Sequence, residues 1–319
     1  MNNKYKVSII VPCYQVAQYI ETSVESMKSQ HFEDFEIILV NDGTKDDSIE
    51  RASAVLSDFD NIKVLDKENG GLPSARNAGL KVAQGKYVCF LDSDDVVSPN
   101  HLSSLYSLCE KNELIASFSL FESTNESNRL GTEIDLRETT ILELDEFLWG
   151  FMDRRYKVHC CALLINRAYL IEHGICFNET LRYGEDIEFM WRLFPQLKKI
   201  GCTNMPTYKY LIRANSLMTS QNIDRVIIAL GELCNVIDQN KVQYPGKKDL
   251  WELLPVRASL GFCHSFARAS NYSSFKELKT RILPAGLWRF IRKYPYRASR
   301  LYAITALLPT KAFYYISRL

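Results

Sequence analysis

Carboxylate side chains cluster in two short segments of the sequence, and their spacing could support metal-assisted chemistry. The first segment, residues 92–95, reads Asp-Ser-Asp-Asp and directly follows the apolar run 87–91. Two acids separated by one residue offer the oxygen ligands that Mg²⁺ and Mn²⁺ prefer, and substrate phosphates can complete the coordination. Asp and Ser also favour turns and helix N-caps for purely structural reasons. The segment alone leaves both interpretations open.

The second acidic segment is Glu185-Asp186, which follows Gly184. The apolar residues around it recur at helical spacing: Ile187, Met190, Trp191 and Phe194. We therefore expect the acid pair at a helix N-terminus, where the helix dipole favours negative charge. A carboxylate there could serve as a general base if it reaches a substrate hydroxyl, or it could simply cap the helix.

The first acidic segment follows the last of four mainly apolar runs, and each run is followed by a helical pattern. The runs are residues 6–12, 35–40, 62–65 and 87–91. Ser74 is expected to cap the third of these helices. Such βα units predict a parallel sheet covered by helices on both faces, with ligands at the carboxyl ends of its strands. Polar segments at 12–14, 41–44 and 92–94 should therefore converge. The chain has no GxGxxG or GxxxxGK motif, so a cation between the acids and a diphosphate is favoured over a glycine-rich phosphate loop.

Composition describes an ordinary folded protein and names no partner. The 319 residues include 39 Lys plus Arg, 38 Asp plus Glu and 46% hydrophobic residues, which suffices for one large catalytic domain or two smaller ones. Nine cysteines without a CxxC motif, and an N-terminus without a leader pattern, predict a reduced, cytoplasmic protein. His159-Cys160-Cys161 could be imagined as a metal site, but small Cys residues in an apolar stretch favour core packing. No apolar run is long enough to span a membrane.

Charge is distributed unevenly along the chain. Eight of the basic residues and none of the acidic ones lie in residues 281–319, interleaved with aromatic side chains. This pattern is typical of an interfacial segment that contacts anionic lipid, so we expect peripheral membrane contact through 281–319. The alternative is a helical cap whose basic edge packs on the more acidic remainder. Nucleic acid is disfavoured as a partner because no recognisable binding module accompanies the tail.

Five strings in order carry a family resemblance: VSIIVPCYQ, IILVNDGTKDDS, NGGLPSARNAGL, GKYVCFLDSDD and LRYGED. Over about residues 5–215 the chain resembles glycosyltransferase family 2, the inverting nucleotide-sugar transferases of GT-A fold. The resemblance implies an α/β catalytic domain over 1–220, with a GT-A type nucleotide-binding sheet that has helices on both faces. Within it we expect a nucleotide-sugar half at about 1–121 and an acceptor half at about 141–220, separated by the polar stretch 123–140. A mainly helical C-terminal region would follow over 221–319.

The resemblance also implies roles for individual residues. The nucleotide-binding residues would be Pro12, Tyr14, Asp42, Arg76, Asp92 and Ser93. Tyr14 would pack on the base and Asp42 would accept a hydrogen bond from uracil. Asp94 would be the principal ligand of Mn²⁺ or Mg²⁺, with Asp92 assisting, whereas Arg76 could instead form a structural ion pair with a neighbouring Asp. Asp186 would be the general base and Glu185 its supporting neighbour.

The implied activity is transfer of a hexose or N-acetylhexosamine from a UDP-sugar, with inversion, to a glycan or lipid-linked saccharide. Bacterial surface or capsular polysaccharide assembly at the cytosolic face of the membrane would be its setting, and the helical region could form a homodimer contact. The alternative is a non-catalytic or regulatory nucleotide-sugar-binding module. The Gln/Arg-x-x-Arg-Trp signature of processive synthases is absent, which predicts one sugar per encounter.

Two details of the sequence qualify this resemblance. The chain has Asp-Gly-Thr where Asp-Gly-Ser is commoner, so the Thr44 hydroxyl is expected to cap the next helix. Arg213, Ser216 and Thr219 are candidates to approach the diphosphate.

Overall fold

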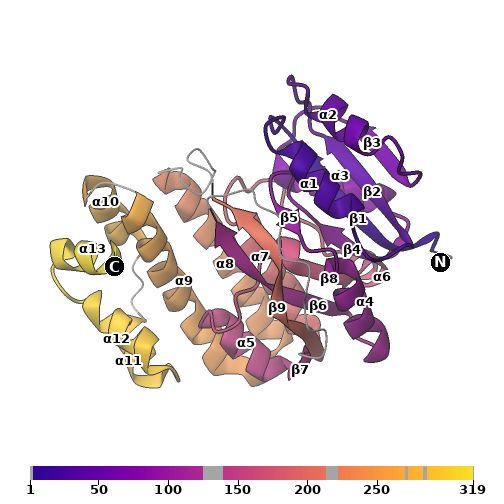
Figure 1. The fold of residues 1–319 in the computed structure, drawn as a ribbon. Helices are drawn as coiled ribbons and strands as arrows, with labels where there is room; N and C mark the ends of the chain where they lie inside the picture. Colours follow the sequence, from indigo (N-terminus) through magenta and orange to yellow (C-terminus); the bar gives the residue numbers. More distant parts are fainter. Residues whose placement is uncertain (1–2, 125–138, 213–221, 270–271, 283–285, 319) are drawn as a thin grey trace. The chain divides into compact units, whose positions relative to one another are not determined.

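The chain folds into two compact units. The structure, a computed structural model, describes residues 3–124, 139–212, 222–269, 272–282 and 286–318 (Figure 1). Unit 1 comprises Met1–Phe147, Tyr156–Arg182 and Gln196–Arg213, and unit 2 comprises Leu148–Arg155, Tyr183–Pro195 and Ala214–Leu319. Most of the polar stretch 123–140, together with Arg213, Ser216 and Thr219, lies outside the described residues. The catalytic-domain boundary at residue 220 stays a prediction.

Unit 1 contains the sheet, and its first four strands follow the predicted pattern. They are β1 (Tyr5–Cys13), β2 (Phe35–Asn41), β3 (Ile62–Asp66) and β4 (Gly85–Phe90). These strands lie in the order β3-β2-β1-β4 and pair in parallel throughout. β1 and β2 are buried along unbroken runs rather than at alternate positions, because both faces of the sheet are covered. The predicted parallel sheet is confirmed.

The sheet continues past β4 with strands that the apolar pattern did not predict. β8 (Leu163–Asn166) pairs antiparallel with β4 and with β6 (Ala116–Thr124). The longest strand, β9 (Lys199–Leu211), pairs with β6, with β5 (Val96–Val97) and with β7 (Thr139–Glu143). The sheet of the described residues is therefore mixed, with nine strands.

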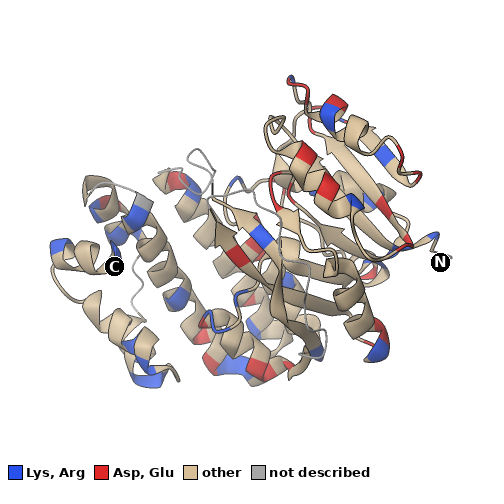
Figure 2. Cartoon of the chain, in the orientation of Figure 1, with Lys and Arg blue, Asp and Glu red and all other residues tan. Residues whose placement is uncertain are grey.

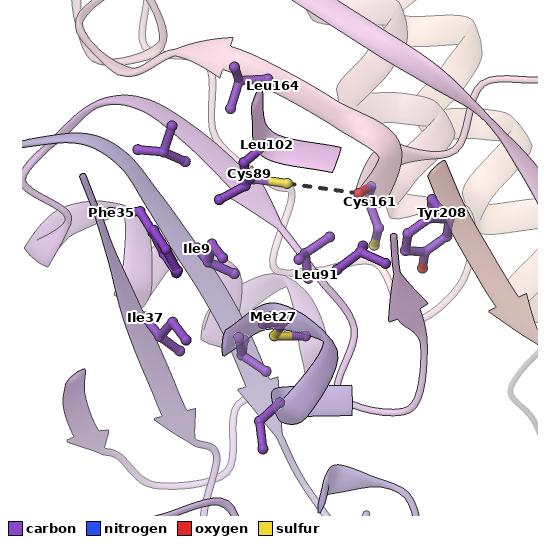
Figure 3. Close-up of a cluster of buried hydrophobic side chains, with 14 of the residues drawn as sticks. Ile9, Met27, Phe35, Ile37, Cys89, Leu91, Leu102, Cys161, Leu164 and Tyr208 are labelled. Carbon is purple, nitrogen blue, oxygen red and sulfur yellow. Dashed lines mark hydrogen bonds between the residues drawn. The ribbon is translucent and has the colours of Figure 1, made fainter. Parts of the chain in front are cut away.

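Helices cover this sheet and complete the core of unit 1. They are α1 (Ile20–Lys28), α2 (Ser48–Val55), α3 (Leu72–Val82), α4 (His101–Lys111) and α6 (Arg167–Glu172). Figure 3 shows part of the core, in which Met27 of α1 and Leu102 of α4 lie among side chains of β1, β2 and β4. Cys160 and Cys161 are fully buried, as predicted for packing residues.

The predicted start of α3 was wrong. Gly71, not Ser74, is the N-cap residue, with φ of +82°. Pro73 lies in the first turn, where the missing N–H costs no intrahelical hydrogen bond. The helix can therefore begin two residues before the expected cap.

Unit 2 is helical in its described part. It holds the second half of α5 (Leu144–Met152), then α7 (Glu185–Leu193), α8 (Ile223–Gln243), α9 (Lys248–Ala269), α10 (Tyr272–Ile282), α11 (Leu287–Lys293), α12 (Arg297–Thr305) and α13 (Thr310–Arg318). Buried aromatic side chains form its core, among them Trp251, Phe275 and Phe290. None of the helices that the structure describes is both long and apolar enough to cross a bilayer.

Candidate functional site

Asp42, at the end of β2, is held in place by a loop of its own chain. Its side chain is almost fully buried, and its carboxylate accepts hydrogen bonds from the backbone N–H groups of Gly70 and Gly71, at 2.9 and 2.7 Å. Lys67 donates to the same carboxylate at 2.5 Å. Gly71 adopts φ of +82°, a conformation that favours glycine and that turns its N–H toward Asp42. The 67–71 loop thus fixes the orientation of this acid.

The loop after β1 is tied to the loop after β2. The Thr44 hydroxyl accepts a hydrogen bond from the Gln15 N–H at 2.9 Å and donates to Asp46 at 2.6 Å. Asp46 also accepts from the Ala17 N–H. Burial acts to raise the pKa of Asp46, but hydrogen bonds from Ser48, Thr44 and Ala17 outweigh burial and lower the pKa, which keeps the carboxylate ionised.

This arrangement corrects the expectation that Thr44 caps the next helix. α2 has Asp47 at its N-cap position, and the hydroxyl of Thr44 joins the two loops instead. The aromatic side chain of Tyr14 is left 46% exposed at this edge of the sheet, while Pro12 is buried in β1.

Asp92, just after β4, forms an ion pair with Arg76 of α3. Arg76 Nη2 lies 2.7 Å from Asp92 Oδ1, and the Arg76 side chain is almost fully buried. The guanidinium also lies 5.0 Å from the centre of the Phe177 ring. Burial would raise the pKa of Asp92, but the charge of the Arg76 guanidinium and its hydrogen bond hold that pKa below its ordinary value. The ion pair that the sequence left as an alternative for Arg76 is therefore present, and Asp92 is held as a carboxylate.

The next two acids differ sharply in their surroundings. Asp94 is half-buried, whereas Asp95 is buried and accepts hydrogen bonds from the Tyr208 hydroxyl and, at 2.7 Å, from the Leu211 N–H. Both donors belong to β9. Burial and the charges of Asp94 and Asp92 raise the pKa of Asp95 to about 8. Ser93, between the two predicted metal ligands, is buried. The loop of residues 92–95 is thus attached to β9 through Asp95.

Aromatic side chains pack beside this loop. The ring of His159 stacks on Tyr208 with 5.2 Å between ring centres and lies 5.4 Å from Tyr210. His159 Nδ1 accepts a hydrogen bond from the Cys161 N–H at 3.2 Å, so this histidine serves the local structure.

The chemistry of this donor set fits a hard divalent cation. Asp92 and Asp94 supply carboxylate oxygens, and the low pKa of Asp92 keeps one of them charged near neutral pH. Within the described ranges, no three His, Cys, Asp or Glu side chains gather in an arrangement that would hold a metal alone. Such a site agrees with Mg²⁺-type binding, in which one or two carboxylates act together with substrate phosphates and water.

In unit 2, Glu185 and Asp186 form the first turn of α7. Gly184 is the N-cap with φ of +72°, as expected from a glycine that turns the chain sharply. Both acids are half-buried. Burial and the charge of Asp186 raise the pKa of the preceding Tyr183 to about 12. Glu188, one turn further along α7, is buried and pairs within the helix with Arg192 through two hydrogen bonds of 2.7 and 2.9 Å.

The structure brings together the predicted residues of unit 1 along one edge of the sheet. Pro12, Tyr14, Asp42, Asp92, Ser93 and Asp94 lie at the carboxyl ends of the parallel strands β1, β2 and β4, and Arg76 joins them through Asp92. Glu185 and Asp186 belong to unit 2, in the first turn of α7.

Sequence reasoning missed the residues that hold these side chains, among them Lys67, Asp95 and Tyr208. Their partners lie 25 to 113 positions away along the chain, so no local spacing could have revealed the contacts. The motif NGGLPSARNAGL did contain a signal, since two adjacent glycines next to a buried acid allow backbone N–H groups to approach it.

Comparison with known proteins assigns a family. The sequence profile described as Glycosyl transferase family 2 matches residues 8–171. The uncharacterized glycosyltransferase EpsJ of Bacillus subtilis is 34% identical over 214 residues, which are 66% of this chain and 62% of EpsJ. The minor teichoic acid biosynthesis protein GgaB of the same organism is 31% identical over 234 residues, 69% of this chain and 25% of GgaB. The chain therefore matches less than two thirds of either relative.

Solved structures share the fold. Staphylococcus aureus TarS 1–349 in complex with UDP-GlcNAc matches with a TM-score of 0.69 and 19% identity, over 98% of this chain and 90% of TarS. The mannosyltransferase PcManGT of Pyrobaculum calidifontis, in complex with GDP-Man and Mn²⁺, matches with a TM-score of 0.59 and 14% identity, over 99% of this chain and 86% of that one. The α/β sheet followed by a mainly helical region, as predicted for a GT-A type fold, is confirmed.

Proposed function

This chain belongs to glycosyl transferase family 2, and we propose that it transfers a sugar from a UDP-sugar to an acceptor hydroxyl with inversion. The observation that carries the proposal is the edge of unit 1 at which Asp42 follows β2, and Asp92 and Asp94 follow β4, with both strands pairing in parallel with β1 between them. That is the edge where open α/β sheets bind nucleotides. The UDP-GlcNAc complex of TarS, which has the same fold, supports a uridine nucleotide as the donor.

The donor would bind through groups that the chain already orients. Tyr14, which is half exposed, would stack on the uracil ring, and Asp42 would accept a hydrogen bond from it. A carboxylate has about four acceptor positions, so Asp42 can contact the 67–71 loop and a base together. Arg76 and Ser93 would stand at the nucleotide edge of the site, with Arg76 acting through its ion pair with Asp92.

Asp94, assisted by Asp92, would hold Mg²⁺ or Mn²⁺ against the donor diphosphate. When bound, the cation supplies positive charge that offsets the charge of the leaving group. The Mn²⁺ complex of PcManGT, which has the same fold, supports a divalent ion.

Asp186 would remove the proton from the acceptor hydroxyl. The acceptor oxygen then forms its bond to the anomeric carbon while the bond from that carbon to the diphosphate oxygen breaks, so the configuration inverts and UDP leaves with the bonding electrons. A base must be ionised and within hydrogen-bond reach of the hydroxyl. The start of α7 suits this role because the helix dipole stabilises a carboxylate there, and Glu185 adds to the negative charge beside it.

Asp94→Asn and Asp186→Asn test these roles. Each should lower kcat for UDP release by about a hundredfold or more, the range of a general base or a charge-stabilising group, with the melting temperature unchanged. Asp58→Asn, an exposed acid of unit 1, is the matched control. An unaltered protein that binds UDP-sugar but transfers nothing to a broad acceptor panel would instead favour a nucleotide-sugar-binding module. Full activity of Asp186→Asn would refute the base.

The proposed setting is assembly of a bacterial surface polysaccharide. The relative GgaB is a teichoic acid biosynthesis protein, which supports polymer assembly as the process. The acceptor would then be a glycan or lipid-linked saccharide.

The C-terminal helices support a second element of the proposal, peripheral attachment to a membrane. Figure 2 shows Lys and Arg but no Asp or Glu on α11, α12 and α13. Large apolar side chains remain exposed there: Trp288, Leu301, Ile304, Leu307, Leu308 and Tyr315. Arg289 and Lys293 pair with acids of α9, so part of the basic edge does pack on the unit. Arg292, Arg297 and Lys311 stay exposed and could contact anionic lipid.

Vesicle sedimentation tests this attachment. The protein should bind vesicles rich in anionic lipid at low salt and release at high salt. Trp288→Ser with Leu301→Ser should weaken binding several-fold, whereas Ile228→Ser, an exposed apolar residue of α8, should not. Equal vesicle binding by both variants, or no vesicle binding by the unaltered protein, would contradict the attachment and indicate that residues 281–319 only pack on the rest of the unit.

A further inference from the structure

One face of α9 in unit 2 carries basic side chains at regular helical spacing. Arg257, His264 and Arg268 stand at intervals of seven and four residues, with Gly261 between the first two. Residues at these intervals share one face of a helix. Arg268 is exposed, and Arg257 and His264 are half-buried, so this face is accessible to a ligand.

A third arginine reaches the same face from another part of the chain. Arg154 lies in the turn after α5 with φ of +62°, a conformation that non-glycine residues rarely adopt. A methyl group at Gly261 would lie 3.5 Å from Arg257 Nη1 and 3.7 Å from Arg154 Nη2. The two guanidinium groups therefore flank the same point on α9. A side chain larger than glycine would narrow the space between them.

These cations have little ionic compensation. None of the carboxylates that the structure describes forms an ion pair with Arg154, Arg257 or Arg268, although Arg192, Arg289 and Lys293 of the same unit are all paired. Nε of Arg257 is buried and has no hydrogen-bond partner among the described residues. Arg257 is linked to an acid only through a tyrosine among these contacts. The Tyr294 hydroxyl is hydrogen-bonded to Arg257 and donates a hydrogen bond to Asp153.

Burial and neighbouring positive charges lower the pKa of two members of the group. Burial and the charge of Arg257 lower the pKa of Arg154. Burial, with the charges of Arg268, Arg154 and Arg257, lowers the pKa of His264. Like charges that are held together without a counterion raise the free energy of the unit, and a bound anion would relieve that cost.

The cationic group lies beside the start of α7. The Tyr183 ring packs 5.9 Å from Phe262 of α9, and its hydroxyl feels the charges of both Asp186 and Arg154. Tyr183 thus links the proposed base to the α9 face. All of these residues belong to unit 2.

From this juxtaposition we propose that Arg154 and Arg257, together with His264 on the same face of α9, bind a phosphate group of the acceptor. The inference rests on the proposed function, because it is the placement of Asp186 as base that makes the neighbouring anion site an acceptor site. Planar guanidinium groups match phosphate oxygens with paired hydrogen bonds, and two of them around one point suit a single phosphate. A neutral sugar would gain nothing from such a cluster. The acceptor class is therefore a phosphate-bearing polyol or saccharide.

The first experiment measures binding and does not depend on turnover. Inorganic phosphate is titrated calorimetrically into the full chain, into Arg154→Gln, into Arg257→Gln and into Arg225→Gln, an exposed arginine of α8 that serves as control. Each of the first two substitutions should weaken phosphate binding about tenfold, the effect of losing one charge-assisted contact. The control should bind like the unaltered protein. Equal phosphate affinity in all four proteins would overturn the site.

Further arms separate the sources of phosphate. UDP is titrated into the same proteins, and its affinity should not change with Arg154→Gln or Arg257→Gln. A parallel loss of UDP affinity would assign the cations to the donor diphosphate and overturn the acceptor proposal. Loss of binding to anionic vesicles together with unchanged kinetics would assign them to lipid headgroups and overturn it likewise.

Transfer assays complete the test. For a phosphate-bearing acceptor the two substitutions should lower kcat/KM about tenfold, mainly through KM, while a neutral acceptor of the same sugar is unaffected. Phosphate binding without any transfer would leave the site standing and refute the proposed function. Transfer that is indifferent to acceptor phosphate would refute the site and leave the proposed function standing.

Discussion

The strand-end loops of unit 1 and the α9 face of unit 2 differ in whether their charged side chains are paired within the chain. In unit 1, the carboxylates of Asp42 and Asp92 each accept hydrogen bonds from residues that are distant in the sequence. In unit 2, Arg154 and Arg257 lie against the same glycine, and no described carboxylate pairs with either. The carboxylates of unit 1 are therefore paired within the chain, whereas the arginines on the α9 face have no acidic partner among the described residues and could pair with a bound anion.

This difference indicates how each region would bind a ligand. Side chains already fixed by their own chain lose little freedom when a ligand arrives, which favours precise placement of a nucleotide and its leaving group. A set of uncompensated cations instead attracts any anion of suitable shape, and its specificity comes from the spacing of the guanidinium groups. The comparison predicts that equivalent substitutions will have unequal effects in the two units.

The largest contrast should come from replacing one arginine in each region. Arg76→Met leaves Asp92 as a largely buried, unpaired carboxylate, so the free energy of unfolding should fall by about 3–5 kcal/mol. Arg154→Met removes a cation from a repelling group and leaves no described carboxylate without its partner, so it should change the free energy of unfolding by no more than about 0.5 kcal/mol. Urea unfolding measures both. Similar losses in the two variants would contradict the contrast, and Arg76→Lys should recover part of the stability.

A smaller contrast concerns packing. A Cβ at Gly79 of α3 would lie 2.3 Å from Cγ2 of Ile10, so Gly79→Ala should destabilise unit 1 by about 1–3 kcal/mol. A Cβ at Gly231 of α8 would meet nothing within 4 Å. Gly231→Ala should therefore stabilise the chain by about 0.5–1 kcal/mol, because alanine favours the helix. Changes of the same sign in thermal unfolding would show that the helical unit is packed as tightly as the sheet.

The third prediction concerns pH and His101, which is fully buried in unit 1. Its Nδ1 lies 2.7 Å from the Thr207 hydroxyl, and burial lowers the pKa of the imidazole to about 3. The unfolded chain takes up a proton below pH about 6.5 while the folded chain does not, so stability falls as the pH falls. Between pH 7 and 5 this histidine should account for about 2 kcal/mol.

His101→Gln removes that contribution, so the unfolding free energy of the variant should depend less steeply on pH over this range. His173→Gln, which alters an exposed histidine, is the control and should keep the original slope. Parallel pH profiles for all three proteins would refute the assignment.

The smallest effect is expected at the link between the loops after β1 and β2. Thr44→Val removes the hydroxyl that joins Gln15 to Asp46 and should cost about 1 kcal/mol of stability. KM for the UDP-sugar should rise because the loop that carries Tyr14 loses its link to the loop after β2. Thr44→Ser keeps the hydroxyl and should retain both properties. A normal KM in Thr44→Val would separate the link from donor binding.

Much of unit 1 was predictable because its strands are buried on both faces. Mainly apolar runs of four to seven residues, such as 6–12 and 35–40, predict strands directly, and the acids that follow them fall at strand ends. α7 was only partly predictable. Its apolar face was expected, but Glu188 is buried too, because Arg192 satisfies its charge from one turn away.

Sequence alone determined which residues could do chemistry, namely Asp92, Asp94 and Asp186, because the type and spacing of side chains are local properties. Tertiary structure decided how the acids are held and where uncompensated charge remains. Tyr208 of β9 reaches Asp95 from 113 residues away, and Arg154 meets α9 only after the chain has folded back on itself. Contacts of this kind depend on strand pairing and helix packing between distant segments, and no pattern of neighbouring residues records them.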